Sequence, residues 1–232
     1  MTGSMSKPTR TTTNPYSEVA RFKDGFFHFS FPESLQWMEK QGKAMFGEHF
    51  TIFPEDHLLI YKLLVYAIGD RENIKRQGMA PEKGVLCLGP IGVGKTVLMT
   101  LINFFFPPGK QYLIRSTREI SFEFETGGYS VINRYSKGSF RSGRNGPVPL
   151  AYCFDDLGIE QPQKYFGNEC HVMAEILLSR YDLFVTKGML THLTTNLSAS
   201  ELENMYGNRI RSRMREMFNL VAFDKDSMDK RK

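Results

Sequence analysis

Apolar and polar positions follow two different patterns along the chain, and the change comes near residue 84. From there on, short apolar runs alternate with longer stretches whose apolar positions recur at helical spacing. We expect strands at 84–89, 112–114, 150–154, 190–195 and 218–223, and helices at 95–106, 118–125, 128–136, 168–186 and 198–217, the last one broken near Gly207. Strands that alternate with helices predict an α/β domain with a mostly parallel central sheet.

The part of the chain before this alternation has a different character. Residues 1–20 are rich in Ser, Thr, Pro and basic residues, which is typical of a flexible tail. Residues 26–54 hold many aromatic side chains, and we expect short elements there that pack onto the main domain. A buried amphipathic helix is predicted from Pro54 to about residue 70, followed by a polar stretch over 69–83. We therefore divide the chain into a flexible tail (1–20), a partly helical N-terminal extension (21–80), a nucleotide-binding core (81–224) and a charged tail (225–232).

The amino-acid composition excludes few classes of protein. The chain has 232 residues, of which 41% are hydrophobic and 24% charged, as expected for one globular core with an appendage. A net charge of +5 suits a polyanionic partner, but many ordinary proteins are equally basic. No signal peptide opens the chain, and no apolar run reaches the roughly 18 residues that a membrane span needs. We expect a cytoplasmic protein with no membrane contact.

The cysteines do not indicate a disulfide framework or a zinc site, because they are three in number and lack CxxC spacing. Cys87 and Cys153 fall in apolar runs, which predicts buried, reduced thiols. Cys170 lies beside His171, a pair that can ligate a metal, but a position on a helix face is the favoured interpretation.

The most informative motif is Gly-Pro-Ile-Gly-Val-Gly-Lys-Thr at 89–96, which matches G-x-x-x-x-G-K-[ST] in full. It follows a predicted strand and opens a predicted helix, so its glycines let backbone amides converge on a phosphate at the helix N-terminus. Lys95 is expected to reach the β- and γ-phosphates, and Thr96 to bind Mg²⁺. The predicted nucleotide-binding residues are Gly89, Pro90, Ile91, Gly92, Val93, Gly94, Lys95, Thr96 and Val97.

Phosphoryl transfer also needs a carboxylate for the metal and a group that orients the attacking water. The strand at 150–154 runs into Asp155 and Asp156, which places both carboxylates at the carboxyl edge of the sheet. We assign Asp155 to the metal, directly or through water, and Asp156 to the general base or water-orienting group, with a solvated acidic turn as the alternative. Asn196, at the end of the next strand, is the candidate for a group between the γ-phosphate and the water; a loop or helix cap is its alternative.

Two basic segments complete the candidates. Arg209, just after Gly207, is positioned to act as an arginine finger on a neighbouring subunit's γ-phosphate, the alternative being an exposed basic helix. Residues 131–147 combine cations with aromatic side chains and contain no acidic residue, a composition that suits single-stranded nucleic acid. The candidate contacts are Arg134, Tyr135, Lys137, Arg141 and Arg144, and the alternative is a solvated flexible loop.

Together these motifs resemble the DnaC/IstB group of AAA+ ATPases. The residues that carry the likeness are GPIGVGKT (89–96), FDDLGIE (154–160) and TTNLSASELENMYGNRIRSRM (194–214), and the resemblance covers about residues 84–224. It implies an AAA+ core of the ASCE type that binds ATP and Mg²⁺ and forms oligomers with sites at subunit interfaces. Asp156 would then be the second Walker B acid, Asn196 sensor 1 and Arg209 the finger acting in trans.

The resemblance also sets expectations that depart from a typical AAA+ protein. Only about eight residues follow the last predicted strand, so the helical lid and its sensor-2 arginine are missing, and Arg213 is a weak substitute. The aromatic segment 26–54 has no obvious counterpart in the family, and a cysteine-rich zinc module is absent from the sequence.

Four functions remain open at this point. The first is an ATPase that loads or remodels a replicative helicase on single-stranded DNA, and the second is an IstB-like helper of a transposase. The third is a nucleotide or small-molecule kinase, which would need a lid and an acceptor pocket, and the sequence offers no candidate for either. A GTPase is disfavoured because the N-K-x-D motif is absent. The fourth is a nucleotide-dependent binding module with little turnover.

Overall fold

The structure is a computed structural model that describes residues 14–231. The chain divides after Ile52 into two compact units, and each is described by itself. The flexible tail expected at 1–20 lies mostly outside the described residues. Its last part forms α1 (Pro15–Glu18) and the start of β1 (Ala20–Lys23), with Asn14 capping the helix through a bond from the Tyr16 amide.

The first unit contains a hairpin and a long helix rather than only short elements. β1 pairs antiparallel with β2 (Phe26–Phe29), and α2 spans Phe31–Phe46. The helix begins here because Ser30 accepts a hydrogen bond from the Glu33 amide and a proline occupies its first turn. The prediction of short elements over 26–54 therefore failed for α2, whose capping residues outweigh its aromatic composition.

The second unit opens with the predicted amphipathic helix. A 3₁₀ turn, η1 (Pro54–Asp56), leads into α3 (His57–Ile68), which ends at Gly69 in a left-handed conformation. The stretch predicted to be merely polar contains α4 (Arg71–Arg76), because the Asp70 carboxylate accepts a hydrogen bond from the Asn73 amide at 3.1 Å.

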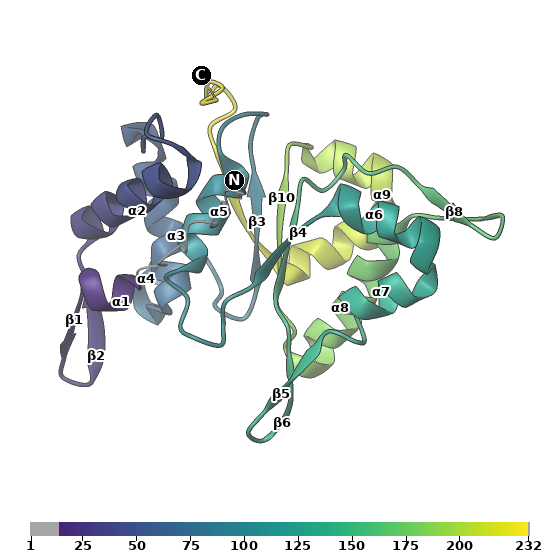
Figure 1. Cartoon of the computed structure of the whole chain (residues 1–232), viewed down its shortest axis with the longest axis horizontal. Coiled ribbons are helices and arrows are strands. Elements are labelled where there is room, and N and C mark those ends of the chain that lie inside the picture. The colour runs from purple at the N-terminus through teal and green to yellow at the C-terminus, as the bar shows by residue number, and fades with distance from the viewer. Residues whose placement is uncertain (1–13, 232) are drawn as a thin grey trace, which may run out of the picture. The chain divides into compact units, whose positions relative to one another are not determined.

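A five-stranded parallel sheet forms the centre of this unit (Figure 1). Its strands are β3 (Gly84–Leu88), β4 (Leu113–Ser116), β7 (Tyr152–Asp155), β10 (Thr191–Thr195) and β11 (Phe218–Ala222), so all the expected strands are present. Their spatial order is β11-β3-β10-β7-β4, and every neighbouring pair is parallel. Because β10 lies between β3 and β7, the loops that follow these three strands meet at one edge of the sheet.

Helices cover both faces of the sheet. Figure 1 shows α3 and α5 (Lys95–Asn103) on one side, and α6 (Thr117–Gly127), α7 (Tyr129–Tyr135), α8 (Val172–Lys187) and α9 (Ala199–Met217) on the other. The second face holds a continuous apolar core in which Phe154 and Leu193 of the sheet are fully buried with Ile120 and Ile176 of the helices. Burial of each such side chain contributes roughly 1.5–3 kcal/mol to folding.

Two hairpins interrupt the regions that were predicted to be loop and helix. β5 (Phe140–Gly143) pairs with β6 (Gly146–Pro149), and β8 (Gln163–Tyr165) pairs with β9 (Asn168–Cys170). The second hairpin turns through Phe166 and Gly167, both at positive φ, and it delays the start of α8 to Val172. The predicted helix at 168–186 was therefore too long at its N-terminal end.

The cysteines are all free and buried. Cys170 ends β9 and is not on a helix face, while His171 precedes α8. Within residues 14–231 no group of three or more His, Cys, Asp and Glu side chains is arranged to hold a metal ion. In the same residues, no helix combines the length and the apolar character needed to cross a membrane.

Candidate functional site

The loop that connects β3 to α5 has the backbone geometry that a phosphate cradle requires. Gly92 and Gly94 adopt φ values of 84° and 93°, a left-handed region that glycine enters without strain. Gly94 is also the N-terminal cap of α5, so the helix begins with its free amides facing this loop. The predicted strand, glycine loop and helix therefore follow one another as the phosphate-binding motif needs, and Val97 lies in the first turn of α5.

The Lys95 side chain packs against the loop 89–96. It is buried, and its Nζ donates hydrogen bonds of 2.8 Å to the carbonyl oxygens of Gly89 and Pro90. Burial lowers the pKa of this ammonium, whereas the nearby carboxylates of Asp156 and Asp155 raise it. A buried lysine with acidic neighbours and only loop carbonyls as bond partners is well placed to move onto a phosphate oxygen.

The two residues predicted to bind Mg²⁺ touch each other. The Thr96 hydroxyl lies 2.9 and 3.0 Å from the two carboxylate oxygens of Asp155, although the residues are far apart in sequence. Burial raises the pKa of Asp155, and hydrogen bonds from Thr194 and Thr96 oppose that shift. A hydroxyl and a carboxylate are hard oxygen donors, which fit Mg²⁺ when phosphate oxygens and water complete the coordination.

The second acid, Asp156, is held in an uncommon backbone conformation. Its φ is 56°, and its amide donates a hydrogen bond of 2.8 Å to the Thr194 hydroxyl. Its carbonyl accepts a second bond, at 2.9 Å, from the Thr117 hydroxyl. Left-handed backbone at a non-glycine residue costs free energy and persists where surrounding contacts determine it, as they do here.

Thr194 is the site residue that the sequence did not single out. Its hydroxyl donates to Asp155 Oδ1 at 2.6 Å while accepting from the Asp156 amide, so one side chain of β10 positions both acids. The sequence signal was that Thr194 is a polar residue near the end of a predicted strand. That this strand, β10, lies between β3 and β7 is known only from the structure. Without the strand order, nothing distinguishes Thr194 from Thr195 or Asn196.

Asn196 and Arg211 lie at the other end of the phosphate loop. Both line an open cavity of about 410 Å³ whose wall also includes Gly89 and Pro90 at the start of the loop. The Nε atom of Arg211 is buried and has no hydrogen-bond partner. Arg211, which the sequence analysis did not choose, is therefore the arginine of α9 that approaches the loop.

Arg213 does not occupy the place expected of a sensor-2 substitute. Its guanidinium carbon lies 4.7 Å from the ring centroid of Tyr181, on α8, and not beside the phosphate loop. Gly207 breaks α9 with φ 81° and ψ 161°, and Arg209 follows the break with an exposed side chain. The helix break that the sequence predicted is present, and all four arginines of 209–215 follow it on one continuous helical segment.

A buried contact ties this break to the acidic loop. The Tyr206 hydroxyl donates a hydrogen bond to one carboxylate oxygen of Glu160, and the other oxygen accepts a bond of 2.9 Å from the Gly158 amide. Both side chains are buried. The loop that follows Asp156 and the turn that precedes Arg209 are therefore linked by one hydrogen-bonded pair.

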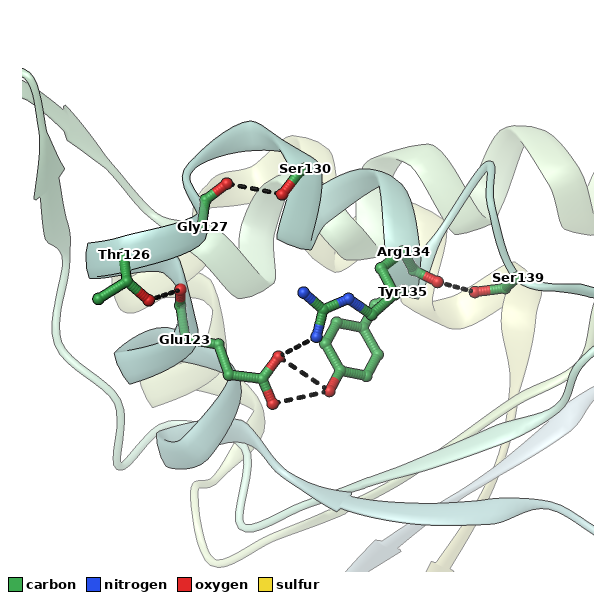
Figure 2. Close-up of polar contacts among 7 residues, drawn as sticks. All are labelled: Glu123, Thr126, Gly127, Ser130, Arg134, Tyr135 and Ser139. Atoms are coloured by element: carbon green, nitrogen blue, oxygen red, sulfur yellow. Dashed lines mark hydrogen bonds and ion pairs between the residues drawn. The ribbon is translucent and has the colours of Figure 1, made fainter.

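The candidate nucleic-acid residues divide into two groups. Figure 2 shows Arg134 and Tyr135 both bonded to Glu123, with the Arg134 Nη1 atom at 2.8 Å and the Tyr135 hydroxyl at 3.0 Å. The Tyr135 ring is buried against Tyr152 and Phe154, so it has no face free to stack on a base. This corrects the role considered for Tyr135.

The other basic residues of the segment remain on the surface. Lys137 and Arg144 are exposed, and Arg144 lies in the turn of the β5–β6 hairpin. Arg141 is also exposed, and its guanidinium donates a hydrogen bond to the Gly109 carbonyl. Most of the expected loop is thus a folded hairpin that carries Arg141 and Arg144, with Lys137 just before it and no stacking tyrosine beside them.

Comparison with known proteins shows the fold. No protein-family model matches the sequence, and no curated protein matches it. Among solved structures, a DnaC helicase loader superposes with a TM-score of 0.51 at 16% identity, covering 80% of this chain and 99% of that one. A putative primosome component from Streptococcus pyogenes serotype M3 gives 0.52 at 13% identity, covering 82% and 91%. DnaI gives 0.50 at 17% identity, covering 75% and 87%.

These structures show the fold of the chain. The five-stranded parallel sheet flanked by helices is the α/β fold of AAA+ P-loop proteins, as the motifs predicted. The DnaC helicase loader, the primosome component and DnaI share this fold with the chain.

Proposed function

We propose that this protein is an ATPase that binds ATP with Mg²⁺ in the loop 89–96 and hydrolyses it with Asp156 as general base. The observation that carries the proposal is the contact between Thr96, at the end of the loop, and Asp155, because it brings together the two residues proposed to bind Mg²⁺. Thr194 supports it, because this residue ties the metal-binding acid to the proposed base. A GTPase would use the same pair, but the sequence lacks the N-K-x-D motif that reads guanine, and it offers no candidate acceptor pocket for a kinase.

Replacement of Lys95 tests the nucleotide site. Lys95→Ala removes the one buried cation of the loop and should weaken binding of a fluorescent ATP analogue in the presence of Mg²⁺ by at least about 100-fold, as loss of a charge-assisted contact of ~3 kcal/mol implies. Equilibrium titration of the full-length chain measures this. Lys187→Ala, which removes an exposed lysine at the end of α8, is the matched control and should bind as the wild type does. Equal affinity of the Lys95 and Lys187 variants would rule out the assigned site.

We further propose that the ATPase loads or remodels a replicative helicase on single-stranded DNA. Similarity to the helicase loader, the primosome component and DnaI over 75% or more of this chain favours that role. The alternative is an ATPase that assists a transposase, which the sequence motifs 154–160 and 194–214 favour equally. Affinity capture from the native host distinguishes the two: a helicase among the bound proteins supports the first role, and a transposase the second.

A further inference from the structure

The chain that follows β11 turns back onto the phosphate loop. The Phe223 amide donates to the Leu88 carbonyl at 2.8 Å, and further on the Lys230 amide donates to the Gly92 carbonyl at 3.0 Å. The Asp229 carboxylate lies so close to Gly92 that a Cβ atom added there would sit 2.2 Å from its Oδ1. Residues 224–231, which we call the C-terminal strap, therefore rest directly on the loop predicted to bind phosphate (Figure 1, the yellow end of the chain).

Lys230 anchors the strap. Its ammonium pairs with the Asp56 carboxylate at the start of α3, and both side chains are almost completely shielded, at 13% and 12% exposure. The same ammonium lies 5.1 Å from the ring centroid of Phe53 and 5.2 Å from that of Phe223. Exposed ion pairs contribute little, but this one is withdrawn from solvent and has two aromatic rings as additional partners.

The groups that the strap covers are those a nucleotide would use. Gly92 belongs to the phosphate loop, and Asp229 places an anion against it. Phe53 and Phe223 offer flat aromatic surfaces, on which a nucleobase can stack, and both are occupied by the Lys230 ammonium. Arg231 is close enough to Lys95 to affect it: burial lowers the pKa of the Lys95 ammonium, and the positive charge of Arg231 lowers it further.

We propose that the C-terminal strap is a tethered competitor of the nucleotide, closing the base side of the site until ATP displaces Lys230 from Phe53, Phe223 and Asp56. The proposal rests on the proposed ATPase function and adds a regulatory element to it. ATP can replace both contacts of the strap, because its base can stack on the rings that the Lys230 ammonium occupies and its phosphates offer the loop anionic oxygens in place of Asp229. Nucleotide binding and release of the strap are therefore coupled.

The proposed competition predicts both the size and the direction of the change in ATP affinity when the strap is released. A site that is open only a tenth of the time binds its ligand with about tenfold weaker apparent affinity, so release of the strap should strengthen ATP binding by roughly that factor. The direction is informative, because removal of a lysine beside an anionic ligand ordinarily weakens binding. A variant that loses a lysine and gains affinity for ATP is the distinctive expectation.

The test is equilibrium binding of a fluorescent ATP analogue with Mg²⁺ to full-length wild-type protein and to Lys230→Ala. We expect about 5–10-fold tighter binding by the variant, in line with a strap closed most of the time. Asp56→Asn removes the other half of the ion pair without altering the strap, and it should strengthen binding in the same direction. Lys187→Ala controls for the loss of one positive charge and should leave the affinity unchanged.

Three results would contradict the proposal in different ways. If wild type and both anchor variants bind ATP equally, the strap does not compete, and the nucleotide site stands. If the anchor variants bind more weakly, the strap is a fixed wall of the site. If neither wild type nor any variant binds ATP at millimolar concentration, the proposed ATPase function fails together with the strap.

Hydrogen exchange gives a second readout. The Lys230 amide is protected by its bond to Gly92, so addition of ATP and Mg²⁺ to the wild-type protein should speed its exchange if the strap is displaced. Unchanged or stronger protection of that amide, measured at saturating ATP, would overturn displacement of the strap.

Discussion

Thr194 is a single hydroxyl on which both acids of the site depend. It donates to Asp155 and accepts from the Asp156 amide, so its loss leaves the carboxylate proposed to bind Mg²⁺ and the strained backbone of the proposed base without their common partner. Removal of a residue that orients a metal ligand typically costs 10–100-fold in metal affinity or activity. We predict that Thr194→Val lowers ATP turnover by about that factor and raises the Mg²⁺ concentration needed for half-maximal turnover.

Steady-state hydrolysis at varied Mg²⁺ measures this effect, with ATP binding followed separately. Thr194→Ser keeps the hydroxyl and should retain most of the activity. If Thr194→Val and Thr194→Ser were equally active, the hydroxyl would have no positioning role.

His192 makes the stability of the second unit depend on pH. It is fully buried in the sheet, its Nδ1 atom accepts a hydrogen bond from the Val85 amide, and burial lowers its pKa to about 3. In the unfolded chain the same imidazole titrates near 6.5. As the pH falls below about 6.5, His192 takes up a proton in the unfolded state but not in the folded state. The free energy of unfolding therefore falls by up to ~1.4 kcal/mol per pH unit until about pH 3.

Urea unfolding between pH 7 and pH 4.5 checks this expectation. His192→Asn removes the titrating group and should make the pH dependence shallower by about one proton, whatever its effect on stability at pH 7. An identical slope for wild type and variant would mean that His192 does not control this range.

At the scale of elements, the sequence predicted what depends on local pattern. The strands of the sheet, the glycine loop before α5 and the break at Gly207 all follow from apolar runs, turn residues and motif spacing. The hairpins β5–β6 and β8–β9 and the helix α2 were missed. Phe166 in a turn at φ 48° is an uncommon choice that no turn rule favours, and α2 depended on a cap at Ser30 within an aromatic segment.

The site was only partly predictable for a related reason. Lys95, Thr96, Asp155 and Asp156 belong to motifs whose spacing defines them. Thr194 and Arg211 gain their positions from the insertion of β10 between β3 and β7 and from the break in α9, and both are tertiary features. The C-terminal strap is likewise invisible in the sequence, because a charged tail carries no pattern that says which surface it covers.

The β5–β6 hairpin is the element on which the nucleic-acid proposal now depends. Arg144 is exposed in the turn of this hairpin and Lys137 is exposed just before it, whereas Tyr135 is buried. If these two cations contact phosphates of single-stranded DNA, the double variant Lys137→Ala with Arg144→Ala should weaken binding and reduce the log–log salt slope by about 1.4, at roughly 0.7 per contact.

Fluorescence anisotropy with a labelled oligonucleotide at several salt concentrations measures that slope. Lys187→Ala again controls for charge alone. A double variant with the wild-type slope would place the DNA contact elsewhere or remove it.

At the scale of the whole molecule, we propose that a second copy of the chain completes the site. Arg209 is exposed and follows the Gly207 break, which suits a side chain that acts on a neighbour's ATP. We predict that Arg209→Ala lowers turnover by about 10³-fold or more, as loss of an arginine finger does, while ATP binding changes little.

Mixing experiments separate action in trans from action within one subunit. Arg209→Ala and Asp156→Ala protein are each expected to be nearly inactive. In a head-to-tail assembly of a 1:1 mixture, about a quarter of the interfaces combine an intact Asp156 with an intact Arg209, so activity should partly return. No recovery at any mixing ratio would argue against a finger supplied by the neighbour.

The strand order also governs how a newly made chain acquires its phosphate loop. β3 is the first core strand to be synthesised, yet its two neighbours are β10 and β11, which come near the end of the described chain. At roughly 5–20 residues per second, both edges of β3 stay unpaired on the ribosome for on the order of ten seconds. Long-range parallel pairing of this kind is slow, and open apolar edges invite association with other chains. The strand that carries the phosphate loop is therefore also the one that most needs protection during biosynthesis.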